Sequence, residues 1–111
     1  METRRGEVWW VAFDPSVVGE IQKTRPAVIV SNNAANAVLN RVVVVPLSSQ
    51  TGKLYPAEAI VTLSGEKRKA MADQIMTASK RRLRTRMGAV SQTDMRAIED
   101  AVLLHLGIHR V

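Results

Sequence analysis

An arginine and two serines stand where apolar runs of this chain meet polar stretches. Arg25 comes at the end of the polar stretch 17–26, just before an apolar run, and Ser48 and Ser49 follow another apolar run. A guanidinium can bind a phosphate bidentately and stabilise charge developing on its oxygens, while a hydroxyl can hydrogen-bond the same group. These residue types permit phosphoryl chemistry on an RNA backbone. Because each also occurs at strand ends for structural reasons, the set alone does not decide the function.

The sequence lacks the residues that most other catalytic chemistries need. The chain has no cysteine, which excludes a disulfide framework, a thiolate metal site and a cysteine nucleophile. His105 and His109 are four residues apart at the end of a helical pattern, with Gly107 between them and no third ligand nearby. We therefore expect no metal site and no cofactor. No P-loop, dinucleotide-binding or Gly-x-Ser-x-Gly motif occurs in the sequence.

The cations of the chain are clustered. The net charge is +6, and half of the sixteen Lys and Arg residues fall in the segments 67–69 and 80–86. Such clustering favours a polyanionic partner, although a basic surface that is simply exposed to solvent would give the same sequence pattern. The N-terminus has no signal-peptide pattern, and no apolar run approaches the ~20 residues of a membrane span. We expect a cytoplasmic protein that does not associate with a membrane.

Short β-branched and aromatic runs predict five or six strands within one domain that spans residues 1–111. We expect these strands at residues 8–13, 26–31, 42–45, 57–63, 70–76 and 87–90. Pro26 is expected at the first position of its strand, and Pro46 predicts that regular pairing stops there. The adjacent Trp9 and Trp10 must point to opposite faces of the sheet. One is therefore predicted in the core and the other at a second face or a partner.

The C-terminal segment changes to helical periodicity. A capping-box pattern, Ser91 to Asp94, precedes the segment, and Gly107 follows it as a C-cap. The apolar positions between them recur at helical spacing: Met95, Ile98, Val102 and Leu106. The fold predicted from these patterns is mainly β with a terminal helix (α+β), a small β-barrel or strongly bent sheet on which the helix packs.

Several short motifs also follow one another in a recognisable order. They are Arg5-Gly6-Glu7-Val8-Trp9-Trp10-Val11, Asp14-Pro15, Gly19-Glu20, Arg25-Pro26-Ala27-Val28-Ile29-Val30-Ser31-Asn32, Val45-Pro46-Leu47-Ser48-Ser49-Gln50, and Asp73-Gln74-Ile75 with Thr77, Lys80 and Leu83. Together these motifs resemble the MazF/PemK family of toxin endoribonucleases. The resemblance covers the chain from about Arg5 to the terminal helix.

The resemblance implies a fold, an activity and partners. The fold is a small SH3-like β-barrel with helical additions, MazF/PemK/CcdB-like, acting as a homodimer. The activity is metal-independent cleavage of single-stranded RNA at short sequence motifs. The RNA 2′-hydroxyl attacks the adjacent phosphate and leaves a 2′,3′-cyclic phosphate and a 5′-hydroxyl. The partner is a cognate MazE-like antitoxin, whose flexible and often acidic tail occupies the RNA groove, as a basic groove would favour.

The resemblance also implies roles for individual residues. Arg25 would be the main catalytic residue, as acid/base or transition-state stabiliser. Ser48, where the family usually has Thr, would hold the scissile phosphate by its hydroxyl. Met76 stands where the family commonly has Arg, which removes one cation from the expected groove. The positions that would bind RNA are Glu20 in the loop after the first strand, Lys23, Gln50, Tyr55 as a stacking ring, Gln74, Thr77 and Lys80.

Two other readings stay open at this point. The first is a non-catalytic poison that resembles CcdB and binds DNA gyrase through its terminal helix. The chain has Leu106-Gly107-Ile108 there, but it lacks the Trp that precedes Gly-Ile in that relative, and three residues follow. The second is a basic RNA-binding barrel without activity, which differs from the nuclease only in product formation.

Overall fold

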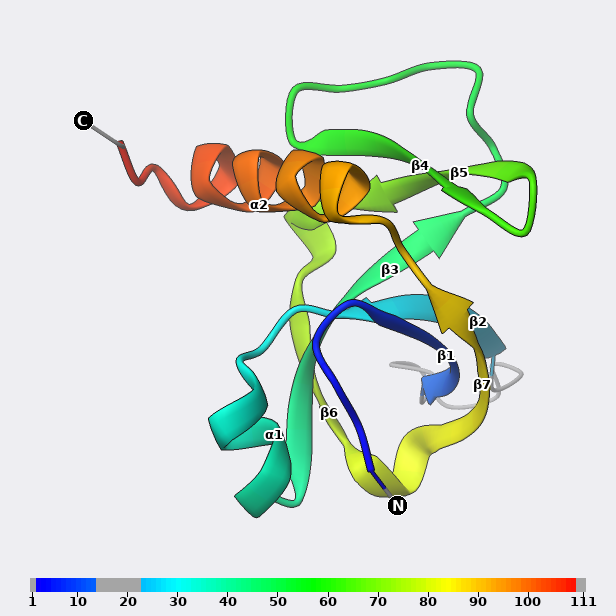
Figure 1. Ribbon diagram of the computed structural model, residues 1–111. Helices are drawn as coiled ribbons and strands as arrows, with labels where there is room; N and C mark the ends of the chain where they lie inside the picture. Colours follow the sequence, from blue (N-terminus) through cyan, green and yellow to red (C-terminus); the bar gives the residue numbers. More distant parts are fainter. Residues whose placement is uncertain (1, 14–22, 110–111) are drawn as a thin grey trace, which may run out of the picture.

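The computed structural model describes residues 2–13 and 23–109, which form a bent antiparallel sheet with helical additions (Figure 1). The elements are, in chain order, β1 (Glu7–Phe13), β2 (Lys23–Ile29), α1 (Asn33–Val38), β3 (Arg41–Ser48), β4 (Glu58–Leu63), β5 (Glu66–Met71), the 3₁₀ turn η1 (Ala72–Gln74), β6 (Met76–Ser79), the 3₁₀ turn η2 (Lys80–Arg82), β7 (Leu83–Ala89) and α2 (Gln92–Leu106).

Strand β3 organises the sheet because it pairs with three other strands in turn. Its residues 41–44 pair with β6, residues 44–46 pair with β2, and residues 47–48 pair with β5. The main strand order is β4-β5-β3-β2-β1-β7, with every pair antiparallel. Because one strand serves three partners along its length, the sheet bends sharply around β3 (Figure 1).

The bent sheet is not closed. The turn η2 connects β6 to β7, yet no ladder joins these two strands in the described part of the chain. The prediction of a mainly β fold with a terminal helix is confirmed. The predicted SH3-like β-barrel describes the sheet only loosely, because an open edge remains between β6 and β7.

Two apolar clusters stabilise the fold from different sides of the sheet. One includes Trp9 and Ile29 and lies among β1, β2, β3 and β6. The other includes Val61 and Ile98 and lies between α2 and the β4–β5 side of the sheet (Figure 1). Trp9 is buried and the adjacent Trp10 is half-buried, as their opposite directions from β1 predict.

Helix α2 begins and ends where the sequence predicts. Ser91 Oγ accepts the backbone N–H of Asp94 at 3.1 Å, and Gly107 adopts the left-handed conformation with φ 71°. The carboxylate of Asp94 in turn accepts the backbone N–H of Thr62 at 2.9 Å, which fastens the start of the helix to β4. Among the described residues, no helix is both long and apolar enough to span a bilayer.

The predicted strand at residues 70–76 is wrong, because this segment is divided between two strands. β5 ends at Met71, the turn η1 follows, and β6 begins at Met76. The two strands pair with different partners, β5 with β4 and β6 with the first half of β3. Ala72 within the turn is fully buried, so the apolar pattern continues although the strand does not. The short strand predicted at 87–90 is likewise the end of a longer one, β7.

The two prolines lie inside strands, contrary to prediction. β2 begins three residues before Pro26, and β3 continues two residues beyond Pro46. What changes at Pro46 is the partner, since Pro46 faces Ala27 in the last pair with β2 and Leu47 then pairs with β5. Proline has no N–H to donate, so neither Pro26 nor Pro46 can supply a ladder donor where β2 and β3 separate.

Candidate functional site

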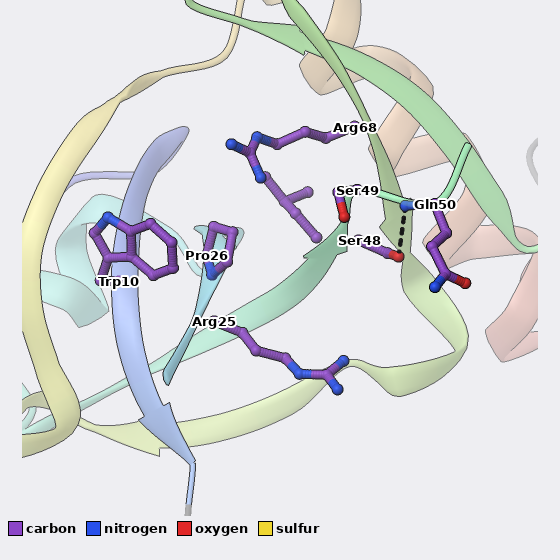
Figure 2. Close-up of a pocket in the computed structure, with 8 residues that line it drawn as sticks. Trp10, Arg25, Pro26, Ser48, Ser49, Gln50 and Arg68 are labelled. Carbon is purple, nitrogen blue, oxygen red and sulfur yellow. Dashed lines mark hydrogen bonds between the residues drawn. The ribbon is translucent and has the colours of Figure 1, made fainter. Parts of the chain in front are cut away.

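A cleft of about 380 Å³ opens where β2 and β3 separate (Figure 2). Beyond the last pair, Ala27 with Pro46, residues 25–26 remain on β2 beside β1, while residues 47–48 turn with β3 to pair with β5. The gap between the diverging strands is the cleft. A change of strand partner therefore positions Arg25 and Ser48 on opposite sides of one hollow.

The lining of the cleft combines cations and polar groups with flat apolar surfaces. The apolar residues are Trp10, Pro26 and Leu47, and the polar residues are Arg25, Ser48, Ser49, Gln50 and Arg68. None of these eight residues is acidic, whereas two carry a positive charge. A concave surface of one sign attracts ligands of the opposite sign, so this cleft is suited to an anion.

The hydroxyl of Ser48 is fixed by the turn that follows β3. The backbone N–H of Gln50 donates to Ser48 Oγ at 3.1 Å, the dashed line in Figure 2. A serine hydroxyl has one proton and two acceptor lone pairs, so this bond leaves its proton for another acceptor. Arg25 is exposed and makes no ion pair within residues 2–13 and 23–109. A phosphate oxygen could accept from both groups.

Arg68 is the member of the cleft that the sequence reasoning missed as a site residue. It lies on β5 opposite Val61, and its side chain is 18% exposed. In the sequence it stands within Lys67-Arg68-Lys69, so it reads as one of three equivalent cations. Only the pairing of β5 with the end of β3 brings it to the cleft, while Lys69 is held by Glu58 and by the carbonyl of Lys53.

Four of the predicted RNA-binding residues are exposed but lie outside the cleft lining. Lys23 opens β2, Thr77 lies on β6 opposite Val43, and Gln74 lies in η1. Tyr55 is 53% exposed, with the Lys53 ammonium 5.0 Å from its ring centroid. Glu20 falls outside the described residues. Of the predicted site residues, the structure thus brings Arg25, Ser48 and Gln50 together.

Lys80 lies at a different place from the cleft. Its ammonium donates to the backbone carbonyl of Asn36 at 2.5 Å, which ties η2 to helix α1. Lys80 lines a separate hollow together with Thr3 and Asn33 near the N-terminus. Lys80 therefore lines another hollow than the cleft that Arg25 lines, and its ammonium is bonded to helix α1.

The described residues contain no metal-binding cluster. No group of three or more His, Cys, Asp or Glu side chains lies close enough to hold a metal ion in this part of the chain. His105 is exposed in the last turn of α2, and His109 is exposed beyond it. The described lining of the cleft offers hydrogen bonding and charge stabilisation by Arg and Ser.

Glu7 fastens the first and last strands of the sheet beside Trp9. Its Oε1 accepts the backbone N–H of Arg4 at 2.9 Å and the indole N–H of Trp9 at 3.0 Å, and its Oε2 accepts Nε of Arg86 at 3.0 Å. Burial raises the pKa of Glu7, but these hydrogen bonds and the charge of Arg86 outweigh burial and leave the pKa below its ordinary value.

Residues 4–106 match the family model described as the PemK-like, MazF-like toxin of type II toxin–antitoxin systems. The chain belongs to this family. The match spans the cleft as well as the sheet and helix α2. The family resemblance predicted from the motifs is therefore confirmed.

Individual relatives of the MazF-like family agree with this assignment. Endoribonuclease MazF9 of Mycobacterium tuberculosis is 38% identical over 114 residues, covering 95% of this chain and 97% of the relative. A solved endoribonuclease from a mycobacterial species has a TM-score of 0.83 at 28% identity, over 100% of this chain and 97% of that one. A mycobacterial endoribonuclease in complex with its cognate antitoxin has a TM-score of 0.81 at 29% identity, over 98% and 99%.

Proposed function

We propose that this MazF-like toxin is a metal-independent, sequence-specific endoribonuclease that cleaves single-stranded RNA to 2′,3′-cyclic phosphate and 5′-hydroxyl ends. The observation that carries the proposal is the cleft itself, where Arg25 and the Ser48 hydroxyl line one hollow whose described lining residues include no acidic side chain. The similarity to Endoribonuclease MazF9 supports it.

Arg25 and Ser48 would act on the scissile phosphate. The 2′-oxygen forms a bond to phosphorus and gives its proton to water, while the bond from phosphorus to the 5′-oxygen breaks and the 5′-oxygen takes a proton from water. Negative charge grows on the non-bridging oxygens during this step. Because a guanidinium stays protonated in proteins, Arg25 is suited to stabilise that charge. The hydroxyl of Ser48 can donate a hydrogen bond to the same oxygens, since its proton is not used in the bond with Gln50.

The exposed polar residues around the cleft would hold the rest of the RNA. Gln50 follows Ser48 directly and can bond a base or sugar edge. The exposed ring of Tyr55 can stack on a base, while Lys23, Gln74 and Thr77 offer polar contacts outside the cleft, and Glu20 is assigned to the same role by the family motif. Lys80 is left out of this set, because its ammonium is bound to Asn36.

The partners proposed for this chain are a second copy of itself and a cognate MazE-like antitoxin. Several large apolar side chains are exposed on the described protomer, among them Leu104 and Ile108 near the end of α2 and Met76 on β6. Such groups are more common in an interface than on a free surface. The solved relative with its antitoxin supports the second partner, for which the cation-lined cleft is a suitable target. We expect both to act in the cytoplasm.

Cleavage in the presence of a chelator tests the nuclease most simply. The purified chain is incubated with a long, unstructured RNA in EDTA, and the ends of the products are mapped and identified chemically. Cuts at a short recurring motif with cyclic-phosphate ends support the proposal. RNA that is bound but stays intact favours a non-catalytic RNA-binding protein, and inhibition of DNA gyrase without RNA cleavage favours the CcdB-like alternative.

A further inference from the structure

The cleft contains a second guanidinium, that of Arg68, which the chemistry at Arg25 does not use. The side chain of Arg68 is largely buried, and its Nε is buried without a hydrogen-bond partner. Within residues 2–13 and 23–109, a single carboxylate oxygen comes within ion-pair distance, Glu66 Oε2 at 3.6 Å, and that side chain is 75% exposed. Burying a cation with so little compensation is unfavourable. Its charge and remaining donors are left for a ligand.

The two arginines of the cleft point to different parts of it. In Figure 2 the Arg25 guanidinium points to the side where Ser48 and Gln50 lie, whereas the Arg68 guanidinium points toward Trp10 and Pro26. The first part offers a cation and a hydroxyl, which suit a phosphate. The second part offers a half-buried indole, a proline ring and a fork of N–H donors, which suit the face and the edge of a nucleobase.

We propose that Arg68 and Trp10 form a base-recognition subsite beside the cleavage site, and that this subsite selects guanine. The inference rests on the proposed RNA-cleaving function and adds a specificity determinant to it. Guanine presents two adjacent acceptors, O6 and N7, which match two N–H groups of one guanidinium. Adenine carries a donor amino group in place of O6, so it cannot accept both bonds.

This assignment is tested by comparing the RNA motifs that chains with single substitutions on β5 cleave. Arg68→Met keeps most of the side-chain volume but removes the charge and the donors. Lys67→Met is the matched control, because it makes the same change on the same strand at an exposed residue outside the cleft lining. Cut sites are mapped on one random RNA pool. We expect a guanine at a fixed position of the wild-type and Lys67→Met motifs, and a loss of that preference by about tenfold or more in Arg68→Met.

A single-atom change in the RNA separates base recognition from phosphate binding. Replacing the selected guanine by 7-deazaguanine removes N7 and leaves every phosphate in place. We expect weaker cleavage by the wild-type chain and no further effect on Arg68→Met. Equal cleavage of both RNAs by the wild-type chain, a uniform loss at all sites in Arg68→Met, or a guanine preference that survives in this variant would each overturn the subsite. A wild-type chain that cuts no RNA would instead overturn the proposed nuclease, and with it this assignment.

Discussion

The backbone N–H of Gln50 donates to the hydroxyl oxygen of Ser48 at 3.1 Å, at the point where β3 ends and the chain enters the cleft wall. The bond fixes one lone pair of the hydroxyl and leaves its proton available to a ligand. The Ser48 side chain has two rotatable bonds, and this hydrogen bond from the neighbouring backbone fixes the position of its hydroxyl oxygen. This relationship supports the proposed role of the Ser48 hydroxyl as a donor to the scissile phosphate.

Substitution of Ser48 should separate the hydroxyl from the shape of the side chain. Thr keeps the hydroxyl of Ser48, whereas Val has nearly the same shape as Thr but no hydroxyl. We expect Ser48→Thr to retain cleavage within a few-fold and Ser48→Val to lose about 10²-fold in rate, the order seen when one donor to a developing oxyanion is removed. Single-turnover cleavage measures both. Equal rates for the two variants would show that the hydroxyl takes no part.

The salt dependence of RNA binding should report the charge of Arg25. A non-cleavable RNA with a 2′-deoxynucleotide at the cut position allows binding to be measured alone. We expect the slope of log affinity against log salt to become shallower by about 0.7 in Arg25→Gln, which corresponds to one lost phosphate contact on a single strand. Arg96→Gln is the control, since Arg96 is exposed on α2 outside the cleft lining. An unchanged slope in Arg25→Gln would place Arg25 away from the phosphates.

Lys80 should matter for stability more than for RNA. Its ammonium hydrogen bond to the carbonyl of Asn36 connects η2 with α1. We expect Lys80→Met to lower the free energy of unfolding by about 1.5–3 kcal/mol, the usual net value of a hydrogen bond made by a charged group, and to leave RNA affinity nearly unchanged. Urea unfolding and binding to the non-cleavable RNA measure the two effects. A normal stability with a clear loss of affinity would return Lys80 to the RNA groove.

Acid should weaken the junction of β1 and β7 through Glu7. Its pKa in the folded chain is lowered, so its contribution to stability is complete above its unfolded pKa and is lost as the pH falls through the folded pKa. We expect Glu7→Gln to be less stable than the wild type by about 1–2 kcal/mol at pH 7, with a difference that shrinks in acid. Urea unfolding between pH 7 and pH 3 measures it.

The exposed Asp100 provides a control for this pH dependence. Asp100→Asn removes a carboxylate from α2 that makes no hydrogen bond or ion pair with the described residues. We expect its stability to follow the wild type at each pH. A Glu7→Gln variant that keeps the same deficit from pH 7 to pH 3 would show that the deficit comes from packing and not from the charge of Glu7.

The fold was predictable where local chemistry decides the structure. The cap at Ser91, the left-handed Gly107 and the opposite faces of Trp9 and Trp10 follow from side-chain type and period, and the structure has each of them. The segment 70–76 was not predictable in this way, because its division between two strands depends on which strands are available to pair. The sequence does not distinguish a buried alanine in a strand from one in a turn, such as Ala72.

The site was predictable in part for the same reason. Arg25 and Ser48 stand at local boundaries that the sequence shows, and the strand divergence at Pro46 brings both to one cleft. Arg68 was not separable from its basic neighbours by sequence, and the motif that singled out Lys80 could not show the contact of Lys80 with α1. Pairing of β5 with β3 turns Arg68 into the cleft, and contact with α1 removes Lys80 from it.

The rate of a single turnover in Arg25→Ala is the most direct test of the proposed chemistry. RNA containing the mapped motif is cleaved in EDTA by the wild-type chain, by Arg25→Ala and by the control Arg96→Ala, after folding of all three is verified by their unfolding curves. We expect Arg96→Ala to cleave at the wild-type rate and Arg25→Ala to be slower by about 10²-fold or more, since it loses the cation that stabilises the phosphate. Cleavage at the wild-type rate by Arg25→Ala would contradict the assignment of this cleft as the catalytic site.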